Sequence, residues 1–180
     1  MFDLERFLAD CRDAVARDPT HRTVREVAAR AVADPAAVLA GLGEPRCGGV
    51  TLLYCSPSLT VLNVVWSPLM QVPPHNHEMW AVIAVYTGRE DGIFWRRVET
   101  DGGHSIEAAG AASLAAGQAE PLGRDIVHSV ANPLDRLTGA IHLYGGDFFA
   151  AERLEWDPET HRRRPYDFER TKEYFARSSG

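Results

Sequence analysis

The sequence has few cysteines and no motif that would use them together. Cys11, Cys47 and Cys55 cannot all pair with one another, and no Cys-x-x-Cys occurs in the 180 residues. A disulfide framework needs an even set of cysteines, and a thiolate zinc site needs closely spaced pairs. Neither is indicated, so the thiols are expected to be buried or chemically idle.

Long apolar runs and an excess of basic residues are also lacking. No apolar span approaches the roughly 18 residues of a membrane helix, and residues 1–15 alternate charged and apolar side chains, unlike a secretory signal. The net charge is −6, and the basic residues are scattered apart from HRRR at 161–164. We therefore expect a cytoplasmic protein that binds neither membrane nor nucleic acid.

What is present is the composition of an ordinary globular protein, with 45% hydrophobic and 24% charged residues. No repeat, linker or low-complexity block divides the chain. We expect a single domain over residues 1–180, with a helical N-terminal segment at 1–42, a β-barrel at 50–156 and a C-terminal wrap at 157–180 that includes a short helix.

The first forty or so residues are predicted to be helical. Apolar residues recur at helical spacing over residues 2–15, and the pair Asp18-Pro19 interrupts the pattern. A second, alanine-rich helix is expected over 23–33, ending near Asp34-Pro35. A third short helix is expected over 35–42.

From residue 50 onward, short β-type runs alternate with turn residues such as Pro73-Pro74 and Asp101-Gly102-Gly103. The runs are VTLLYC, LTVLNVVW, MWAVIAVYTG, GIFWRRVE, HSIEAAG, ASLAAG, DIVHSVAN and LTGAIHLYG. Eight or so strands at this spacing predict a mainly β fold, a double-sheet barrel or jelly roll, in place of alternating βαβ units.

Three of the seven histidines fall where strands of one barrel can converge. If the segment VPPHNHEMW is extended, His75 and His77 point to the same side of the strand. His128 shares its face with apolar residues and is expected to point inward. A lone inward histidine is usually a hydrogen-bonded core residue. Three together would offer neutral nitrogens to a divalent metal ion and leave coordination positions open.

A fourth ligand is not evident beside this trio. A carboxylate often follows a His-x-His pair, but residues 79–84 are all apolar here. In a regular strand Glu78 should face opposite to His77, as a rim or hydrogen-bonding residue. Because structural metal sites usually fill all four positions, the missing ligand favours an open site.

Three segments, PPHNHEMWAVIAVYTGRE, RDIVHSVANP and GAIHLYGGDFFAAER, carry a resemblance to a known family. Together they resemble the thiol dioxygenases of the cupin superfamily, iron enzymes related to cysteine dioxygenase, and look most similar to the bacterial 3-mercaptopropionate dioxygenase branch. The resemblance covers residues 50–156. It implies a cupin double-stranded β-helix with Fe(2+) on His75, His77 and His128. The implied reaction joins O2 to a small thiol carboxylate, 3-mercaptopropionate or cysteine, and gives the sulfinic acid.

The segment GAIHLYGG places Ala140, His142 and Tyr144 on one face of a strand. A core histidine bonded to a core tyrosine is the simplest interpretation. The resemblance instead implies a Ser-His-Tyr chain in which His142 orients a catalytic Tyr144. Ala140 stands where the serine belongs, so His142 is expected to lack one partner. No cysteine stands where some relatives crosslink one to this tyrosine.

Arg153 matches the position of the arginine that, in the family, holds the substrate carboxylate. A guanidinium suits this task because its planar fork donates two parallel hydrogen bonds to a carboxylate. A surface salt bridge with Glu152 or Glu155 is the alternative. Arg96 and Arg97 are competing candidates, and one of them is expected to point inward.

Two other interpretations stay open. One is a metal-dependent cupin enzyme of another reaction type, using nickel, manganese or zinc, and Ala140 is the best support for it. The other is a non-catalytic metabolite-binding cupin, in which the histidines form a structural site or a hydrogen-bonded cluster. The sequence does not fix the number of subunits.

Overall fold

The computed structural model describes residues 2–100 and 103–177, and residues 1, 101–102 and 178–180 lie outside this description. The helices are α1 (Leu4–Arg17), α2 (His21–Val32), α3 (Pro35–Leu42) and α4 (Phe168–Arg177). The strands are β1 (Gly49–Ser56), β2 (Leu59–Trp66), β3 (Gln71–Asn76), β4 (Ala81–Thr87), β5 (Arg89–Thr100), β6 (Gly103–Ala115), β7 (Ala119–Leu122), β8 (Val127–Ala131), β9 (Thr138–Tyr144), β10 (Leu154–Trp156) and β11 (Arg163–Pro165).

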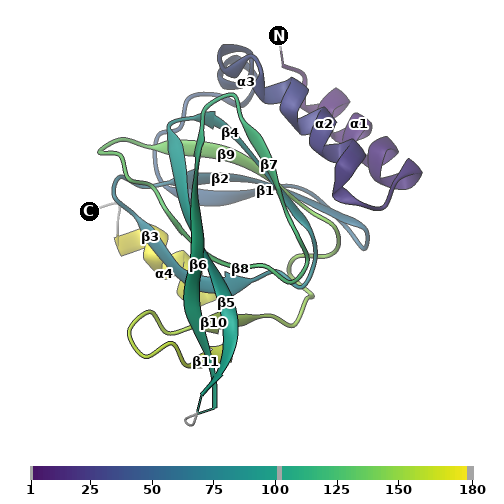
Figure 1. The fold of residues 1–180 in the computed structure, drawn as a ribbon. Helices are drawn as coiled ribbons and strands as arrows, with labels where there is room; N and C mark the ends of the chain where they lie inside the picture. The colour runs from purple at the N-terminus through teal and green to yellow at the C-terminus, as the bar shows by residue number, and fades with distance from the viewer. Residues whose placement is uncertain (1, 101–102, 178–180) are drawn as a thin grey trace.

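The strands form two antiparallel sheets, with the orders β1-β2-β9-β4-β7 and β11-β10-β3-β8-β5-β6. From β2 to β9 the chain passes from one sheet to the other at every step except the β5–β6 hairpin. This winding is that of a jelly roll, in which two Greek keys close into a double-stranded β-helix. The predicted mainly β fold is therefore confirmed (Figure 1).

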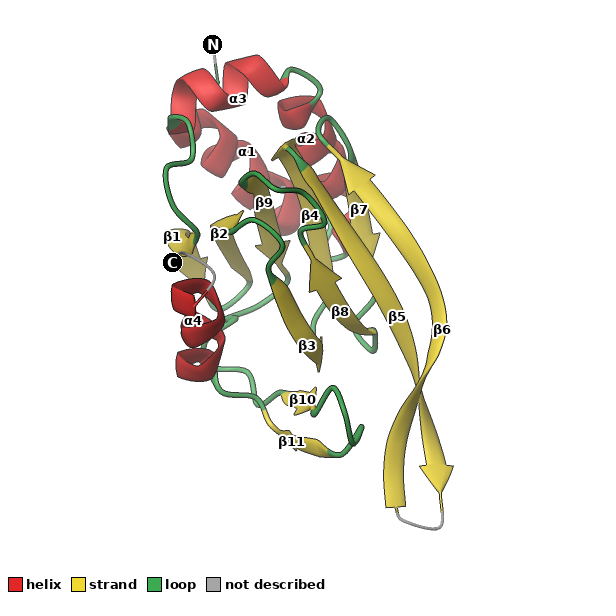
Figure 2. Cartoon of the chain, turned by 90° about the vertical axis from the view of Figure 1, so that its left-hand side faces the viewer, coloured by secondary structure: helices red, strands yellow, loops and turns green. Residues whose placement is uncertain are grey.

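Helices α1 to α3 cover the face of the first sheet that points away from the second sheet (Figures 1 and 2). Each begins at a side chain that accepts a hydrogen bond from the first turn: Asp3, Thr20 and Asp34. Their buried faces pack with outward-facing residues of β2, β4 and β9 in one apolar cluster. The helices thus bury one face of this sheet and leave the other face to line the barrel.

Alternation along β9 decides which side chains enter the barrel. Ile141 and Leu143 belong to the apolar cluster under the helices, whereas Ala140 and Tyr144 belong to the cluster inside the barrel. His142 is also buried and lines the interior cavity with Tyr144. The expected common face of these three residues is therefore confirmed.

The strand boundaries differ from the sequence prediction in several places, and the short strands β10 and β11 were not predicted. Residues Pro73-Pro74, expected as a turn, lie inside β3, where the β3–β8 register shifts between Val72 and His75. A proline donates no hydrogen bond to the ladder, so it fits at such an irregularity. Two predicted runs are one long strand, β6, and β7 was not predicted. The β5–β6 hairpin extends well beyond the barrel (Figure 2).

The C-terminal segment closes one side of the barrel. Strand β10 pairs with β3 and β11, and α4 contacts β1 and β3. Phe168, Thr171 and Phe175 of α4 line the interior cavity. Among the described residues, no helix has the length and apolar character needed to cross a bilayer.

Candidate metal centre

The three predicted histidines come together inside the barrel. His75 ends up opposite His128 in the β3–β8 ladder, and His77 follows directly after β3. One ligand atom from each of the three lies within 4.8 Å of the others, and Nε2 of His77 is 3.3 Å from Nε2 of His128. Within the described residues, this is the one such group of three or more potential ligands. The trio could hold a metal ion.

The donor set fits a divalent transition metal. Two nitrogens bonded to one ion at about 2.1 Å, and separated by 90–110°, lie about 3.0–3.4 Å apart. The distance between the facing nitrogens of His77 and His128, 3.3 Å, falls in this range. The Nδ1 atom of His77 is buried and has no hydrogen-bond partner among the described residues. The facing Nε2 atoms of His77 and His128 are therefore the ones placed to coordinate an ion.

Burial keeps the three rings neutral, as metal ligands must be. The pKa of His75 is lowered to about 4, chiefly by desolvation; the Pro73 carbonyl opposes this shift, and the nearby Arg153 and His142 add to it. Desolvation also puts the pKa of His77 and of His128 well below the ordinary value. Since a protonated imidazole cannot bind a metal ion, these shifts extend the pH range in which binding is favoured.

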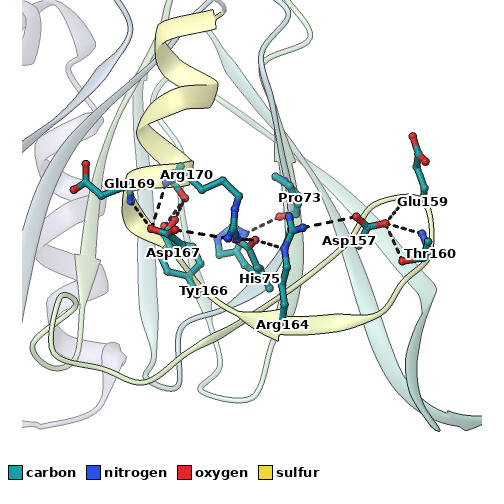
Figure 3. A network of polar contacts seen from close by, with 12 residues as sticks. Pro73, His75, Asp157, Glu159, Thr160, Arg164, Tyr166, Asp167, Glu169 and Arg170 are labelled. Atoms are coloured by element: carbon teal, nitrogen blue, oxygen red, sulfur yellow. Dashed lines mark hydrogen bonds and ion pairs between the residues drawn. The ribbon is translucent and has the colours of Figure 1, made fainter. Parts of the chain in front are cut away.

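His75 is oriented by the chain that precedes it. Its Nδ1 lies 2.9 Å from the carbonyl oxygen of Pro73 (Figure 3). A carbonyl only accepts hydrogen bonds, so Nδ1 carries the proton and Nε2 keeps the lone pair that a metal ion needs. Backbone carbonyls commonly fix the tautomer of ligating histidines in this way.

His142 is held differently from the trio. Its Nδ1 lies 3.0 Å from the Tyr144 hydroxyl, and its Nε2 lies 3.1 Å from Oε1 of Glu90. Trp66 donates its indole N–H to the same Oε1 at 2.6 Å. The expectation that Ala140 leaves His142 short of a partner is wrong, because Glu90 occupies that nitrogen.

Glu90 is the residue that the sequence interpretation missed. It is 5% exposed and stands two positions before Gly92 and four before Phe94 on β5, so all three share a face. The predicted strand began at Gly92, which left Glu90 in a charged turn. The two-residue alternation of the strand, extended back from Phe94 through Gly92, would have placed Glu90 on the inward face.

Tyr144 connects the His142 network to the histidine trio. Its ring stands edge-on to His77 with centroids 5.0 Å apart. Burial raises its pKa, with Glu90 and Tyr166 adding to the effect and Arg153 opposing it. Tyr144 therefore remains a neutral phenol at physiological pH, with a hydrogen to donate.

Arg153 is buried beside the site and forms no ion pair with a described residue. Its guanidinium lies between two rings, 3.8 Å from the centroid of Phe148 and 4.0 Å from that of Tyr166. Its Nε and Nη1 are buried without a hydrogen-bond partner among the described residues. Desolvation lowers its pKa from the ordinary value, and Tyr166 and Tyr144 oppose this.

The alternative partners proposed for Arg153 are engaged elsewhere or exposed. Glu155 is buried, accepts a hydrogen bond from Nε of Arg164 at 2.6 Å and pairs with Arg170. Glu152 is exposed. The surface salt bridge considered for Arg153 is therefore not formed.

Neither of the competing arginines points inward, so that expectation is wrong. Arg96 and Arg97 are both exposed on the β5–β6 hairpin. Arg96 pairs with Glu107, and Arg97 lies 3.5 Å from Glu78. Glu78 also accepts a hydrogen bond from Asn76 at 2.5 Å, in keeping with the hydrogen-bonding role expected for it.

The space in front of the trio is small and mostly apolar. The cavity measures about 50 Å³, room for only a few water-sized groups. Its walls include the three histidines, His142, Tyr144, and the rings of Trp66, Phe148, Tyr166, Phe168 and Phe175. Such a lining excludes bulk water and suits a ligand of few atoms.

Comparisons of the sequence find no matching family model and no matching curated protein. Among solved structures, the backbone is similar to an RmlC-like cupin family protein with a double-stranded β-helix fold from Methanocaldococcus jannaschii, 9% identical over 59% of this chain and 87% of that chain, with a TM-score of 0.48. It is also similar to a DMSP lyase from Ruegeria pomeroyi, 18% identical over 63% of this chain and 53% of that chain, with a TM-score of 0.48. At such low values these similarities say nothing about the reaction.

Proposed function

We propose that this protein is an Fe(2+)-dependent thiol dioxygenase that converts a small thiol carboxylate, 3-mercaptopropionate or cysteine, and O2 to the sulfinic acid. The observation that carries the proposal is the pairing of two features: three converging neutral imidazoles, and a buried guanidinium beside them with two unpartnered N–H groups. The first suits a metal ion with open positions, and the second suits an anion.

The ligand set favours an anionic sulfur. Three neutral imidazoles leave the full charge of a divalent ion uncompensated, unlike two histidines and a carboxylate. A ferrous ion bound by His75, His77 and His128 would supply the redox chemistry that brings thiolate and O2 together. Both oxygen atoms end on sulfur, so RSH and O2 give RSO2H with no other reductant.

The remaining residues would bind and orient the substrate. Arg153 would hold the carboxylate, because its unpartnered N–H groups offer two donors and its flanking rings, Phe148 and Tyr166, line the cavity. Tyr144 would hydrogen-bond the reacting end of the substrate, and His142 would orient Tyr144. The apolar walls would keep water from the reacting atoms.

The test begins with purified protein loaded anaerobically with Fe(2+). We expect O2 uptake that depends on 3-mercaptopropionate or cysteine and yields one sulfinate per O2, measured with an oxygen electrode and by mass spectrometry. Metal binding without thiol-dependent O2 uptake would contradict the proposal. It would favour a second candidate, a metal-dependent enzyme acting on another small anion. The carboxylate Glu90, in place of the family serine, is the observation that favours that candidate.

Arg153→Ala tests the carboxylate clamp. A hydrogen bond to a charged group is worth about 1.5–3 kcal/mol, so kcat/KM for carboxylated thiols should fall about 10- to 100-fold. Cysteamine has no carboxylate, so its turnover should change by no more than about threefold.

The matched control is Arg153→Lys, which keeps the charge but loses the planar fork. It should lie between the wild type and Arg153→Ala for carboxylated thiols. Equal losses for cysteamine and 3-mercaptopropionate in Arg153→Ala would rule out the clamp.

A further inference from the structure

Glu90 is a buried carboxylate to which the proposed reaction assigns no role. It is 5% exposed, on the barrel-facing side of β5. Two ring nitrogens meet the same oxygen, Oε1: the indole N–H of Trp66, which donates at 2.6 Å, and Nε2 of His142 at 3.1 Å. Burying a carboxylate costs free energy unless hydrogen-bond donors compensate it, so the presence of Glu90 in an apolar barrel suggests a functional role.

Two hydrogen bonds and one ring contact connect Glu90 to the histidine trio. Nε2 of His142 lies beside Oε1 of Glu90, and Nδ1 of the same ring lies 3.0 Å from the Tyr144 hydroxyl. The Tyr144 ring then stands against His77, centroid to centroid at 5.0 Å. Glu90 is therefore two hydrogen bonds away from a group in contact with a candidate metal ligand.

A carboxylate at this place restricts the histidine ring. Oε1 of Glu90 accepts a hydrogen bond from the Trp66 indole, which can only donate, so the His142 nitrogen that faces this acceptor oxygen must carry the proton. This fixes Nε2–H on His142 and leaves Nδ1 facing Tyr144. Ala140, which shares this face of β9, has no hydroxyl to compete for the ring.

We propose that Glu90 is a positioning residue that fixes the ring orientation and the Nε2–H tautomer of His142, and thereby holds the Tyr144 hydroxyl at the candidate metal centre. The consequence for turnover rests on the proposed function. The tautomer itself does not, because it belongs to the protein with or without a substrate.

The barrel supplies a matched control for Glu90. A second cavity, of about 260 Å³, is lined by Glu90, His128 and Leu122, and also by a second carboxylate, Glu120 on β7. Glu120 is exposed, and its ion pair with Arg25 spans 3.9 Å. Replacing Glu120 removes a negative charge from the same cavity but leaves the contacts of His142 intact. The comparison therefore distinguishes the effect of the Glu90–His142 hydrogen bond from the effect of charge alone.

The experiment compares Glu90→Leu and Glu120→Leu in the full-length chain by ¹⁵N NMR of the histidine rings, with His142 assigned by its absence in His142→Gln. In the wild type and in Glu120→Leu we expect His142 protonated at Nε2 and not at Nδ1. In Glu90→Leu the Nε2–H preference should be lost. An unchanged His142 tautomer in Glu90→Leu would overturn the proposal.

Steady-state kinetics then test the consequence for turnover. Loss of a residue that orients a group at a metal centre typically costs 10- to 100-fold, so kcat of Glu90→Leu should fall by about that factor while metal content and KM for the thiol stay unchanged. A loss confined to KM, or an equal loss in Glu120→Leu, would contradict a positioning role.

The two failures are distinguishable, because NMR decides the tautomer even if the wild-type protein oxidises no thiol. If Glu90→Leu does not fold, Glu90→Asp serves in its place, because its side chain is one methylene shorter and moves the carboxylate away from His142. The same loss of the Nε2–H preference and the same fall in kcat are expected. A wild-type tautomer in Glu90→Asp, with kcat unchanged, would equally overturn the proposal.

Discussion

Four histidines line one cavity of the barrel, three of them buried and His75 half-buried, and they fall into two groups. His75, His77 and His128, from β3, the residue after it and β8, direct ring nitrogens at one another. His142, from β9 in the opposite sheet, has both nitrogens engaged, by Glu90 and Tyr144. All four line the same cavity.

The difference lies in the neighbours of each ring and not in the depth of burial. A histidine whose nitrogens are both engaged by a carboxylate and a phenol has no lone pair left for a metal ion. A histidine whose Nε2 faces only another Nε2 still has a lone pair that can bind a metal ion. The two groups therefore suit different tasks, coordination and orientation, and the three predictions below test this contrast.

The largest effect is expected from removing one ring of the trio. His128→Ala takes away one of three ligands, and metal affinity should fall by at least about 100-fold, so that purified protein no longer retains one ion per chain. Metal content is measured by mass spectrometry after dialysis. The exposed His104, which pairs with Glu99 outside the barrel, supplies the control His104→Ala. Full metal retention by His128→Ala would break the contrast.

A smaller effect concerns the stability of the metal-free protein in acid. The folded-state pKa of His75 is lowered to about 4 and those of His77 and His128 are also lowered, against about 6.5 in the unfolded chain. Between these values the unfolded state binds more protons. The stability that the neutral rings contribute is therefore complete above about pH 6.5 and is lost as the pH falls through the window toward 4.

Urea unfolding of the metal-free protein at several pH values measures this loss. Each ring that stays neutral contributes a slope of up to about 1.4 kcal/mol per pH unit within the window. His77→Gln removes one such ring and should flatten the dependence, whereas His104→Gln should leave it unchanged. Equal slopes in the wild type and in His77→Gln would contradict the lowered pKa of His77.

The smallest effect is expected at Ala140. Because Glu90 already engages Nε2 of His142, a hydroxyl introduced by Ala140→Ser finds that nitrogen occupied. A buried hydroxyl without a partner costs about 1 kcal/mol or more, which lowers Tm by roughly 2–4 °C in a chain of this size. We expect no gain in kcat. Calorimetry checks the first expectation, and an increase in kcat would show that Glu90 does not satisfy His142.

Patterns within single strands were enough to predict the jelly roll and the inward histidines. The alternation around His128 and along residues 140–144 predicted the correct faces, because side chains in a regular strand point alternately to its two sides. Pro73-Pro74 were predicted to be turn residues, and the register shift against β8 shows how strand β3 accommodates them.

Two charged residues whose burial depends on distant partners were harder to predict, and their surroundings could not be read from single strands. Glu90 lies in the charged segment Arg89-Glu90-Asp91, but in the structure it is buried, with ring nitrogens of Trp66 and His142 at 2.6 and 3.1 Å from its Oε1. Arg153 likewise adjoins charged neighbours in the sequence, while its burial comes from Phe148 and Tyr166. Alternation back from Phe94 indicates the inward face of Glu90, but a single sequence does not show which distant groups compensate a buried charge.

The facing nitrogens of His77 and His128 also have a mechanical consequence. They belong to chain positions 51 residues apart, on neighbouring segments of one sheet. An ion bound between them would act as a reversible crosslink that closes this loop in the folded chain alone. The free energy of metal binding would then be added to the free energy of unfolding, and a chelator would lower the barrel's resistance to heat as well as its activity.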